Sequence, residues 1–125
     1  MKTVIQTDQA PAAIGCYSQA IKANNTVYLS GQIPLDPKTM TLVSSDIESQ
    51  VVQVFENLQS VCKAANGNLN QIVRLTVYLR DINHSTVVND VMKRLFKQPY
   101  PARTTFAVVA LPKEALVEID GILVL

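Results

Sequence analysis

The residue of this chain that most needs a chemical explanation is Arg103, in the stretch "YPARTTFAVVAL" at residues 100–111. It stands at the head of a run that predicts a buried strand, and Thr105 shares its strand face. A guanidinium is always charged and requires partners when it is buried. Its planar fork also binds a carboxylate through two parallel hydrogen bonds. Arg103 is therefore either half of a structural ion pair with Glu118 or Asp120, or a clamp for a carboxylate ligand.

Two carboxylates interrupt the last predicted strand, "LVEIDGILVL" at residues 116–125. The period-two alternation of a strand places Glu118 and Asp120 on one face, among apolar neighbours. Buried carboxylates need hydrogen-bonding partners or a raised pKa. Two interpretations stay open: the carboxylates serve a site, or one of them is an edge-strand charge that prevents aggregation.

Isolated polar residues give weaker signals of a site. Tyr17 in "GCYSQAI" either lines a pocket or packs, and Ser30 either lines a pocket or satisfies a strand end. Asn89 lies beside the apolar stripe of a predicted helix, where an exposed polar role is the alternative. His84, near a predicted helix start, fits a surface or capping role. The sequence has no P-loop, GxGxxG, GxSxG or HExxH pattern.

The composition limits the classes of function. The chain has 125 residues, which predicts one domain spanning residues 1–125. Its 11 basic and 10 acidic residues are scattered along the sequence, so a nucleic-acid surface is not expected. Two cysteines without a CxxC pair and a single histidine argue against a disulfide scaffold and against a metal site.

The distribution of apolar residues predicts where the protein resides and how it assembles. Residues 1–9 lack the apolar core of a signal peptide, and no apolar run approaches the roughly 20 residues of a membrane span. We therefore expect a soluble, cytoplasmic protein. Hydrophobic residues make up 48% of the chain, and the mean hydropathy is +0.17. Because small domains have much surface for their volume, this apolar surplus predicts an interface with other subunits.

Eight elements in the order β-β-β-α-β-α-β-β must position these residues. Asn24 and Asn25 suit a tight hairpin turn because they tolerate positive φ, and Gly31 predicts a bulge or a close backbone approach. The elements are predicted as strands at 2–6, within the hairpin 19–34, and at 71–80, 103–111 and 116–125, and as helices within 44–67 and 84–96.

These elements predict a mixed α/β sheet with both helices on one face. Ser45 and Glu48 form a capping-box signature at the start of the first helix. The opposite face of the sheet must also be covered, and a partner subunit is the simplest cover. One face of the strand at 71–80 is expected to hold Val73, Leu75, Val77 and Leu79.

Five segments resemble, in chain order, the hallmark segments of the RidA/YjgF family of reactive-intermediate deaminases. They are "GCYSQAI", "VYLSGQIPLDP", "QVFENLQSVCKAANGNLNQIVRLTVYLRDI", "VND" and "YPARTTFAVVALPKEALVEIDGI", and they span nearly the whole chain. The resemblance implies a chorismate-mutase-like α/β fold assembled as a homotrimer, with sites in clefts between subunits. It also implies hydrolysis of 2-imino acids such as 2-iminobutanoate and 2-iminopropanoate, or their enamine tautomers, to 2-keto acids and ammonia without a cofactor.

The resemblance carries roles to individual residues by their position in these segments. Arg103 corresponds to the family's arginine that clamps the substrate carboxylate, and Glu118 to the glutamate implicated in activating water. Their two strands are expected to be adjacent. Thr105 occupies a position that is often cysteine, where the backbone is expected to hold the substrate nitrogen or the water. The other positions that line the family's cleft match Tyr17, Ser30, Gly31 and Asn89.

Three departures from the family pattern stand out. Cys16 replaces a usual proline, Asp120-Gly121 replaces a more usual Glu-Ala pair, and the segment between Asn89 and Arg103 is a few residues shorter than in many members. Two alternatives to an imine deaminase stay open. One is a binding or regulatory protein that holds a small carboxylate, such as a 2-keto acid, without turnover. The other follows older family names and is an endoribonuclease or translation inhibitor.

Overall fold

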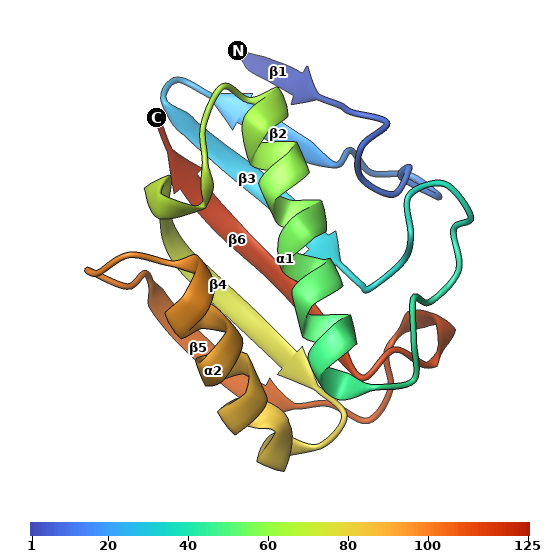
Figure 1. Cartoon of the computed structure of the whole chain (residues 1–125). Helices are drawn as coiled ribbons and strands as arrows, with labels where there is room; N and C mark the ends of the chain where they lie inside the picture. Colours follow the sequence, from blue (N-terminus) through green and yellow to red (C-terminus); the bar gives the residue numbers. More distant parts are fainter.

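The computed structural model of the chain describes residues 1–125 as one six-stranded mixed sheet with two helices on one face (Figure 1). The strand order is β1-β2-β3-β6-β4-β5, and β4–β5 is the parallel pair while the others are antiparallel. The predicted order of eight elements is confirmed. The elements are β1 (Lys2–Ile5), β2 (Ala20–Ala23), β3 (Thr26–Gln32), α1 (Ile47–Ala64), β4 (Ile72–Leu79), α2 (Ser85–Leu95), β5 (Ala102–Ala107) and β6 (Val117–Val124), with short 3-10 turns η1 (Leu69–Gln71), η2 (Ile82–His84) and η3 (Pro112–Glu114).

The hydrophobic core lies between the helices and the sheet. The aromatic rings of Phe55 and Phe96 meet edge to face, with centroids 5.4 Å apart. Neither helix combines the length and apolar character that crossing a membrane requires. The fully buried core residues include Val51, Val54, Phe55, Leu75, Val77, Leu79, Val88, Val91, Val117, Ile119 and Leu123.

Two predicted turn features of the first hairpin are confirmed. Asn24 has a φ of 54° in the turn between β2 and β3, a value that asparagine tolerates better than most residues. The register of β3 against β6 shifts between Leu29 and Gln32, which places a bulge at Ser30 and Gly31. Because of this bulge, β3 changes direction near its end, where Gln32 pairs with Ile119 of β6.

Several predicted boundaries and faces are wrong in detail. The cap of α1 is Asp46, whose carboxylate accepts from the Ser49 amide at 3.0 Å, so the predicted Ser45–Glu48 capping box does not form. Val73 does not share the buried face of β4, because the register against β6 shifts between Ile72 and Arg74 and leaves Val73 exposed. The strand predicted at 103–111 ends at Ala107, and the strand predicted at 116–125 spans Val117–Val124.

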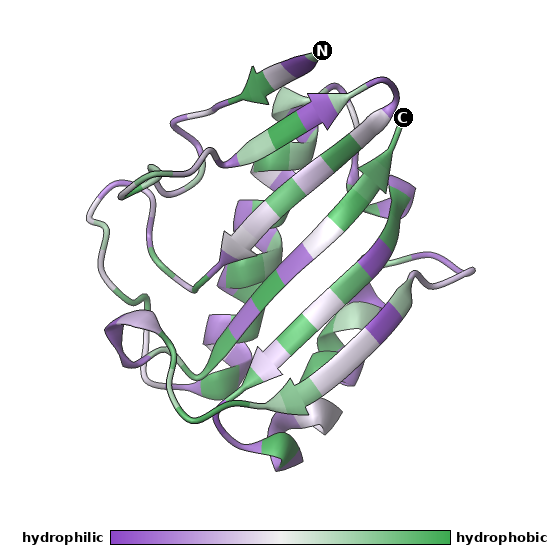
Figure 2. Cartoon of the chain, turned by 180° about the vertical axis from the view of Figure 1, so that it is seen from behind, coloured by the Kyte–Doolittle hydropathy of each residue, from purple (hydrophilic) through white to green (hydrophobic).

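The sheet face away from the helices has no cover within the chain. Figure 2 shows this face, with the helices behind it and hydrophobic and hydrophilic residues mixed along the strands. Among its side chains, Tyr28 is 51% exposed and Phe106 is 42% exposed. We call it the open face below.

A buried glutamine connects α1 to the start of β6. Gln50 is 1% exposed; its Oε1 accepts from the Leu116 amide at 2.8 Å, and its Nε2 donates to the Ser44 carbonyl at 2.8 Å. Both bonds satisfy backbone groups outside helices and strands. Gln50 therefore fixes where β6, and with it Glu118, enters the sheet.

Replacing Gln50 by methionine should destabilise the fold. Gln50→Met keeps the length of the side chain but leaves the Leu116 amide without its partner, so we expect a loss of about 1–3 kcal/mol in the free energy of unfolding. Urea unfolding monitored by circular dichroism measures this loss, with Gln9→Met at an exposed position as the control. Equal stability of the two variants would contradict the role assigned to Gln50.

Candidate functional site

All predicted site residues except Thr105 line one of two cavities on opposite faces of the sheet. One cavity, of about 240 Å³, lies between α2 and the start of β5 and includes Asn89 and Arg103. The other, of about 540 Å³, is beside the end of β3 and includes Tyr17, Ser30, Gly31 and Glu118 in its lining. We call them the arginine cavity and the glutamate cavity. Thr105 lines neither of them.

The register of the strands places Arg103 and Glu118 on different faces. Arg103 pairs with Leu75 of β4, whose side chain is buried under the helices, so Arg103 shares the helix-covered face. Glu118 pairs with Tyr78 of β4, which points to the open face. The expectation that their strands are adjacent is wrong, because β4 lies between β5 and β6.

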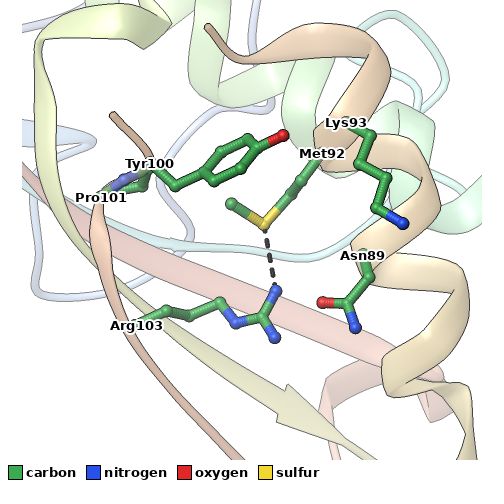
Figure 3. Close-up of a pocket in the computed structure, with 6 residues that line it drawn as sticks. All are labelled: Asn89, Met92, Lys93, Tyr100, Pro101 and Arg103. Atoms are coloured by element: carbon green, nitrogen blue, oxygen red, sulfur yellow. Dashed lines mark hydrogen bonds between the residues drawn. The ribbon is translucent and has the colours of Figure 1, made fainter. Parts of the chain in front are cut away.

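Arg103 has no carboxylate partner. Its guanidinium donates to Met92 Sδ at 3.3 Å, and sulfur is a weak acceptor (Figure 3). The chain's one ion pair joins Arg94 and Glu48 at 3.6 Å on the surface. The structural ion pair of Arg103 with Glu118 or Asp120 is therefore absent from the chain.

The arginine cavity suits an anion. Figure 3 shows Asn89 and Lys93 of α2 across from the guanidinium of Arg103, with Tyr100 above it. No aspartate or glutamate is among the lining residues. Two cations and an amide without an acidic neighbour form a place for a carboxylate, which the fork of an arginine binds bidentately.

The hydroxyl of Thr105 has no protein partner. Thr105 follows Arg103 by two residues and pairs with Val77, so it lies on the same helix-covered face. Its Oγ1 is buried and makes no hydrogen bond. A buried hydroxyl without a partner costs free energy, and such groups in native proteins call for an explanation.

The carboxylate of Glu118 lies directly against the backbone of Gly31. A Cβ added to Gly31 would collide with Glu118 Oε2, so the bulge in β3 and the missing side chain together make room for the carboxylate. Both predicted roles of Gly31, a bulge and a close backbone approach, are confirmed. Burial, and secondly the charge of Asp120, raise the pKa of Glu118 above the usual value for a glutamate.

Tyr17 and Ser30 line the glutamate cavity but are engaged in local hydrogen bonds. The Tyr17 hydroxyl accepts from the Ile14 amide at 3.2 Å, and the Ser30 hydroxyl donates to the Ser18 carbonyl at 2.6 Å. These bonds fix the loop before β2 against the end of β3. The loop therefore forms one wall of the cavity.

Three residues that support the glutamate cavity were not predicted. Gln19 donates from its amide to the Pro11 carbonyl at 2.8 Å and accepts from the Thr7 amide at 2.7 Å, which closes the loop around the cavity. Asn57 of α1 donates to the carbonyl of Leu35 at 3.1 Å. Lys113 lines the cavity from a backbone with φ of 55°. Glutamine, asparagine and lysine at such spacing have no sequence signal that distinguishes them from surface residues.

The remaining predicted positions are accounted for. Cys16 is exposed, and Cys62 is buried in the core with its pKa raised to about 12 by burial. His84 ends η2, outside both cavities; its side chain makes no capping hydrogen bond to α2, so the capping role is wrong, and its Nδ1 is buried without a partner. No three histidine, cysteine, aspartate or glutamate side chains gather closely enough to hold a metal ion.

Comparisons with known proteins agree over nearly the whole chain. The family model described as Endoribonuclease L-PSP matches residues 7–125. A 2-iminobutanoate/2-iminopropanoate deaminase of Dermatophagoides farinae is 42% identical over 124 residues, which are 99% of this chain and 97% of that protein. The crystal structure of RidA from Psychrobacter sp. PAMC 21119 is 49% identical with a TM-score of 0.95, and the match covers 98% of this chain and 99% of that one. The crystal structure of E. coli TdcF with bound serine is 32% identical with a TM-score of 0.91, and covers 98% of each chain.

The fold defines an α+β protein in which two helices cover one face of a six-stranded mixed sheet. Within that class, the match of the family model to residues 7–125 and the 42–49% sequence identity to these relatives over nearly the whole chain show that the protein belongs to the RidA/YjgF/RutC family.

The contact between Gly31 and Glu118 should appear as an energetic coupling. Gly31→Ala forces the new methyl group against the Glu118 carboxylate, so we expect a loss of about 1–3 kcal/mol in the free energy of unfolding. In the Glu118→Ala background the same substitution should cost much less, because the colliding atoms are gone.

Urea unfolding of the four proteins in this cycle measures the coupling. Gly67→Ala serves as the control, since its nearest side chains belong to Leu125, Gln71 and Leu123 rather than to Glu118. An equal cost of Gly31→Ala in both backgrounds would show that Gly31 does not make room for Glu118.

Proposed function

We propose that this protein hydrolyses 2-imino acids, such as 2-iminobutanoate and 2-iminopropanoate, to 2-keto acids and ammonia. The observation that carries the proposal is an arginine without a counter-ion and a glutamate with a raised pKa, each in a cavity open to solvent. Relatives about 42% identical are named as deaminases of these imines, which supports the same chemistry here.

The proposed active site is completed by a second copy of the chain, in a homotrimer. Within one chain, Arg103 and Glu118 lie on opposite faces of the sheet with β4 between them, so one substrate cannot reach both. The open face offers Tyr28, Phe106, Ile122 and Val124 as cover for a neighbour. An assembly that apposes the arginine cavity of one subunit to the glutamate cavity of the next brings the two groups to one cleft.

Arg103 would hold the substrate by its carboxylate. Two parallel charge-assisted hydrogen bonds, each contributing about 1.5–3 kcal/mol, fix the plane of the 2-imino acid. The adjacent C=N carbon is then aimed at the glutamate cavity of the neighbouring subunit. Asn89 and the backbone at Thr105 are placed near the arginine to orient the imine nitrogen or the attacking water.

Glu118 would activate the water. Its carboxylate takes a proton as the water oxygen bonds to the C=N carbon, the electron pair of the C=N π bond moves to nitrogen, and Glu118 passes the proton on to that nitrogen. In the resulting carbinolamine the hydroxyl proton is transferred to the amino nitrogen, the C–N bond breaks to release ammonia, and the O–H electron pair forms the carbonyl of the 2-keto acid. A positioned base contributes about 10²- to 10⁴-fold, most when its pKa approaches the working pH, and the raised pKa of Glu118 acts in that direction.

The first test removes the clamp. We expect Arg103→Ala to lose nearly all acceleration of imine hydrolysis, because the carboxylate loses both of its hydrogen bonds. An amino-acid oxidase or dehydratase that generates the imine, coupled to this protein, allows imine disappearance to be followed. Arg94→Ala, which removes a surface arginine, is the matched control and should keep the parent rate. An Arg103→Ala variant as active as the parent would refute the mechanism.

The second test asks whether each site uses two subunits. Arg103→Ala and Glu118→Gln are each expected to be inactive alone. Co-expressed in equal amounts with different tags, they should form mixed trimers in which about a third of the sites, one in each trimer, pair an intact Arg103 with an intact Glu118. Specific activity near that fraction supports the shared site, and no recovery in isolated mixed trimers would contradict it.

A second candidate function is binding of a small carboxylate without turnover. It is supported by the solved relative with serine bound and by the anion-binding character of the arginine cavity. Calorimetry with 2-ketobutyrate, compared with the imine assay on the same sample, separates the two. Binding of the keto acid that depends on Arg103, without any imine hydrolysis, would favour this candidate.

A further inference from the structure

A tyrosine and an aspartate form a hydrogen-bonded pair beside Glu118. Tyr78 Oη donates to Asp120 Oδ2 at 2.7 Å. Asp120 follows Glu118 by two residues in β6, so both carboxylates point to the open face. Tyr78 is the register partner of Glu118 on β4. All three side chains therefore lie together on the same face of the sheet.

The tyrosine is held in a fixed orientation. Its ring meets that of Phe106 on β5 edge to face, with centroids 5.1 Å apart and planes at 80°. The hydrogen bond to Asp120 is the main cause that raises the pKa of Tyr78 to about 12, so the phenol stays protonated at any pH near neutrality. It can donate to the aspartate throughout the range in which a glutamate titrates.

The hydrogen bond from Tyr78 holds the Asp120 carboxylate in one orientation on the open face. Asp120 therefore presents a localised negative charge to Glu118. This charge adds to burial in making Glu118 harder to ionise, and its effect grows when a subunit interface excludes water.

We propose that Tyr78 and Asp120 are a positioning pair that strengthens Glu118 as a base, with Tyr78 holding the Asp120 carboxylate in place and Asp120 acting on Glu118 through its charge. The role of Glu118 as the base rests on the proposed function. The pair itself does not touch the substrate.

The other ionisable groups around Glu118 are Tyr17 and Lys113 in the glutamate cavity, Tyr28 on β3, and Arg74 and Arg80 on or just after β4. They do not replace Asp120 in this role. None of them forms a hydrogen bond or an ion pair with Glu118, and Asp120 supplies the charge that raises its pKa. Arg74 is engaged with the Thr104 hydroxyl at 2.7 Å. The β3 bulge beside Glu118 contributes Ser30 and Gly31, which carry no charge.

The decisive variant is Asp120→Asn. Removing the negative charge makes Glu118 easier to ionise, so its titration midpoint should move to lower pH by about half a unit or more. Two measurements report this midpoint: ¹³C NMR of the glutamate carboxyl carbons, assigned with Glu118→Gln, and the acidic limb of the pH profile of kcat/KM for 2-iminobutanoate. Both should shift in the same direction. Glu56→Gln removes one exposed carboxylate from α1 and should shift neither.

The contribution of Tyr78 is tested in the same background. If tyrosine acts through the aspartate, adding Tyr78→Phe to Asp120→Asn should leave the Glu118 midpoint where the single substitution placed it. A further shift would show that Tyr78 acts on Glu118 directly and would overturn the pairing. Asp120→Ser removes the charge with a different side chain and provides the comparison if the asparagine variant fails to fold.

An unchanged Glu118 midpoint in a folded Asp120→Asn or Asp120→Ser protein would overturn the proposal. The NMR titration separates this failure from a failure of the proposed function. If the parent protein does not hydrolyse imines, the proposed function is wrong, yet the titration still decides whether Asp120 sets the proton affinity of Glu118.

Discussion

The charge of Arg103 has no counter-ion within its own chain, and the position of β4 is the reason. A parallel pair needs a crossover, so α2 returns the chain to the same end of the sheet and places β5 at the edge beside β4. Arg103 then faces the helices, at a cavity without an acidic residue. β6 enters on the other side of β4 and carries its two carboxylates on the opposite face. We propose that an anion from outside the chain binds this guanidinium.

The glutamate is held under the opposite constraint, since its surroundings disfavour its charge. Burial and the charge of Asp120 raise the pKa of Glu118 in the folded chain. The folded state therefore binds this proton more tightly than the unfolded state. Stability attributable to Glu118 is greatest at low pH and falls as pH rises toward and through the raised pKa. The fold thus holds this carboxylate at a cost to its own stability, which is common at functional sites.

Much of the architecture follows from local pattern in the sequence. The helix α1, the turn at Asn24 and the bulge at Gly31 were predictable because each depends on residues close in the chain. The shared face of Glu118 and Asp120 follows from alternation alone. Strand order does not, because consecutive strands such as β5 and β6 need not pair, and this made the predicted adjacency of Arg103 and Glu118 wrong. Val73 was misplaced because a register shift after Ile72 interrupts the alternation.

Sequence patterns do not identify the polar residues that support the site, and the reason is physical. Gln19, Gln50 and Asn57 are buried amides whose partners are backbone groups distant in the sequence. Amide side chains are neutral, and their spacing resembles that of surface residues, so only the folded chain reveals their partners. They hold the loops around the glutamate cavity and at the start of β6. The residues that could do chemistry were therefore easier to predict from the sequence than the residues that position them.

The central claim is that one substrate meets Arg103 from one subunit and Glu118 from another. A crystal structure of the protein with 2-ketobutyrate tests it most directly. We expect the keto acid carboxylate on the Arg103 guanidinium in a bidentate arrangement, and the keto carbon facing Glu118 of the neighbouring subunit. An Arg103 that is instead paired with a carboxylate of a neighbouring chain, or a keto acid bound away from both residues, would contradict the account.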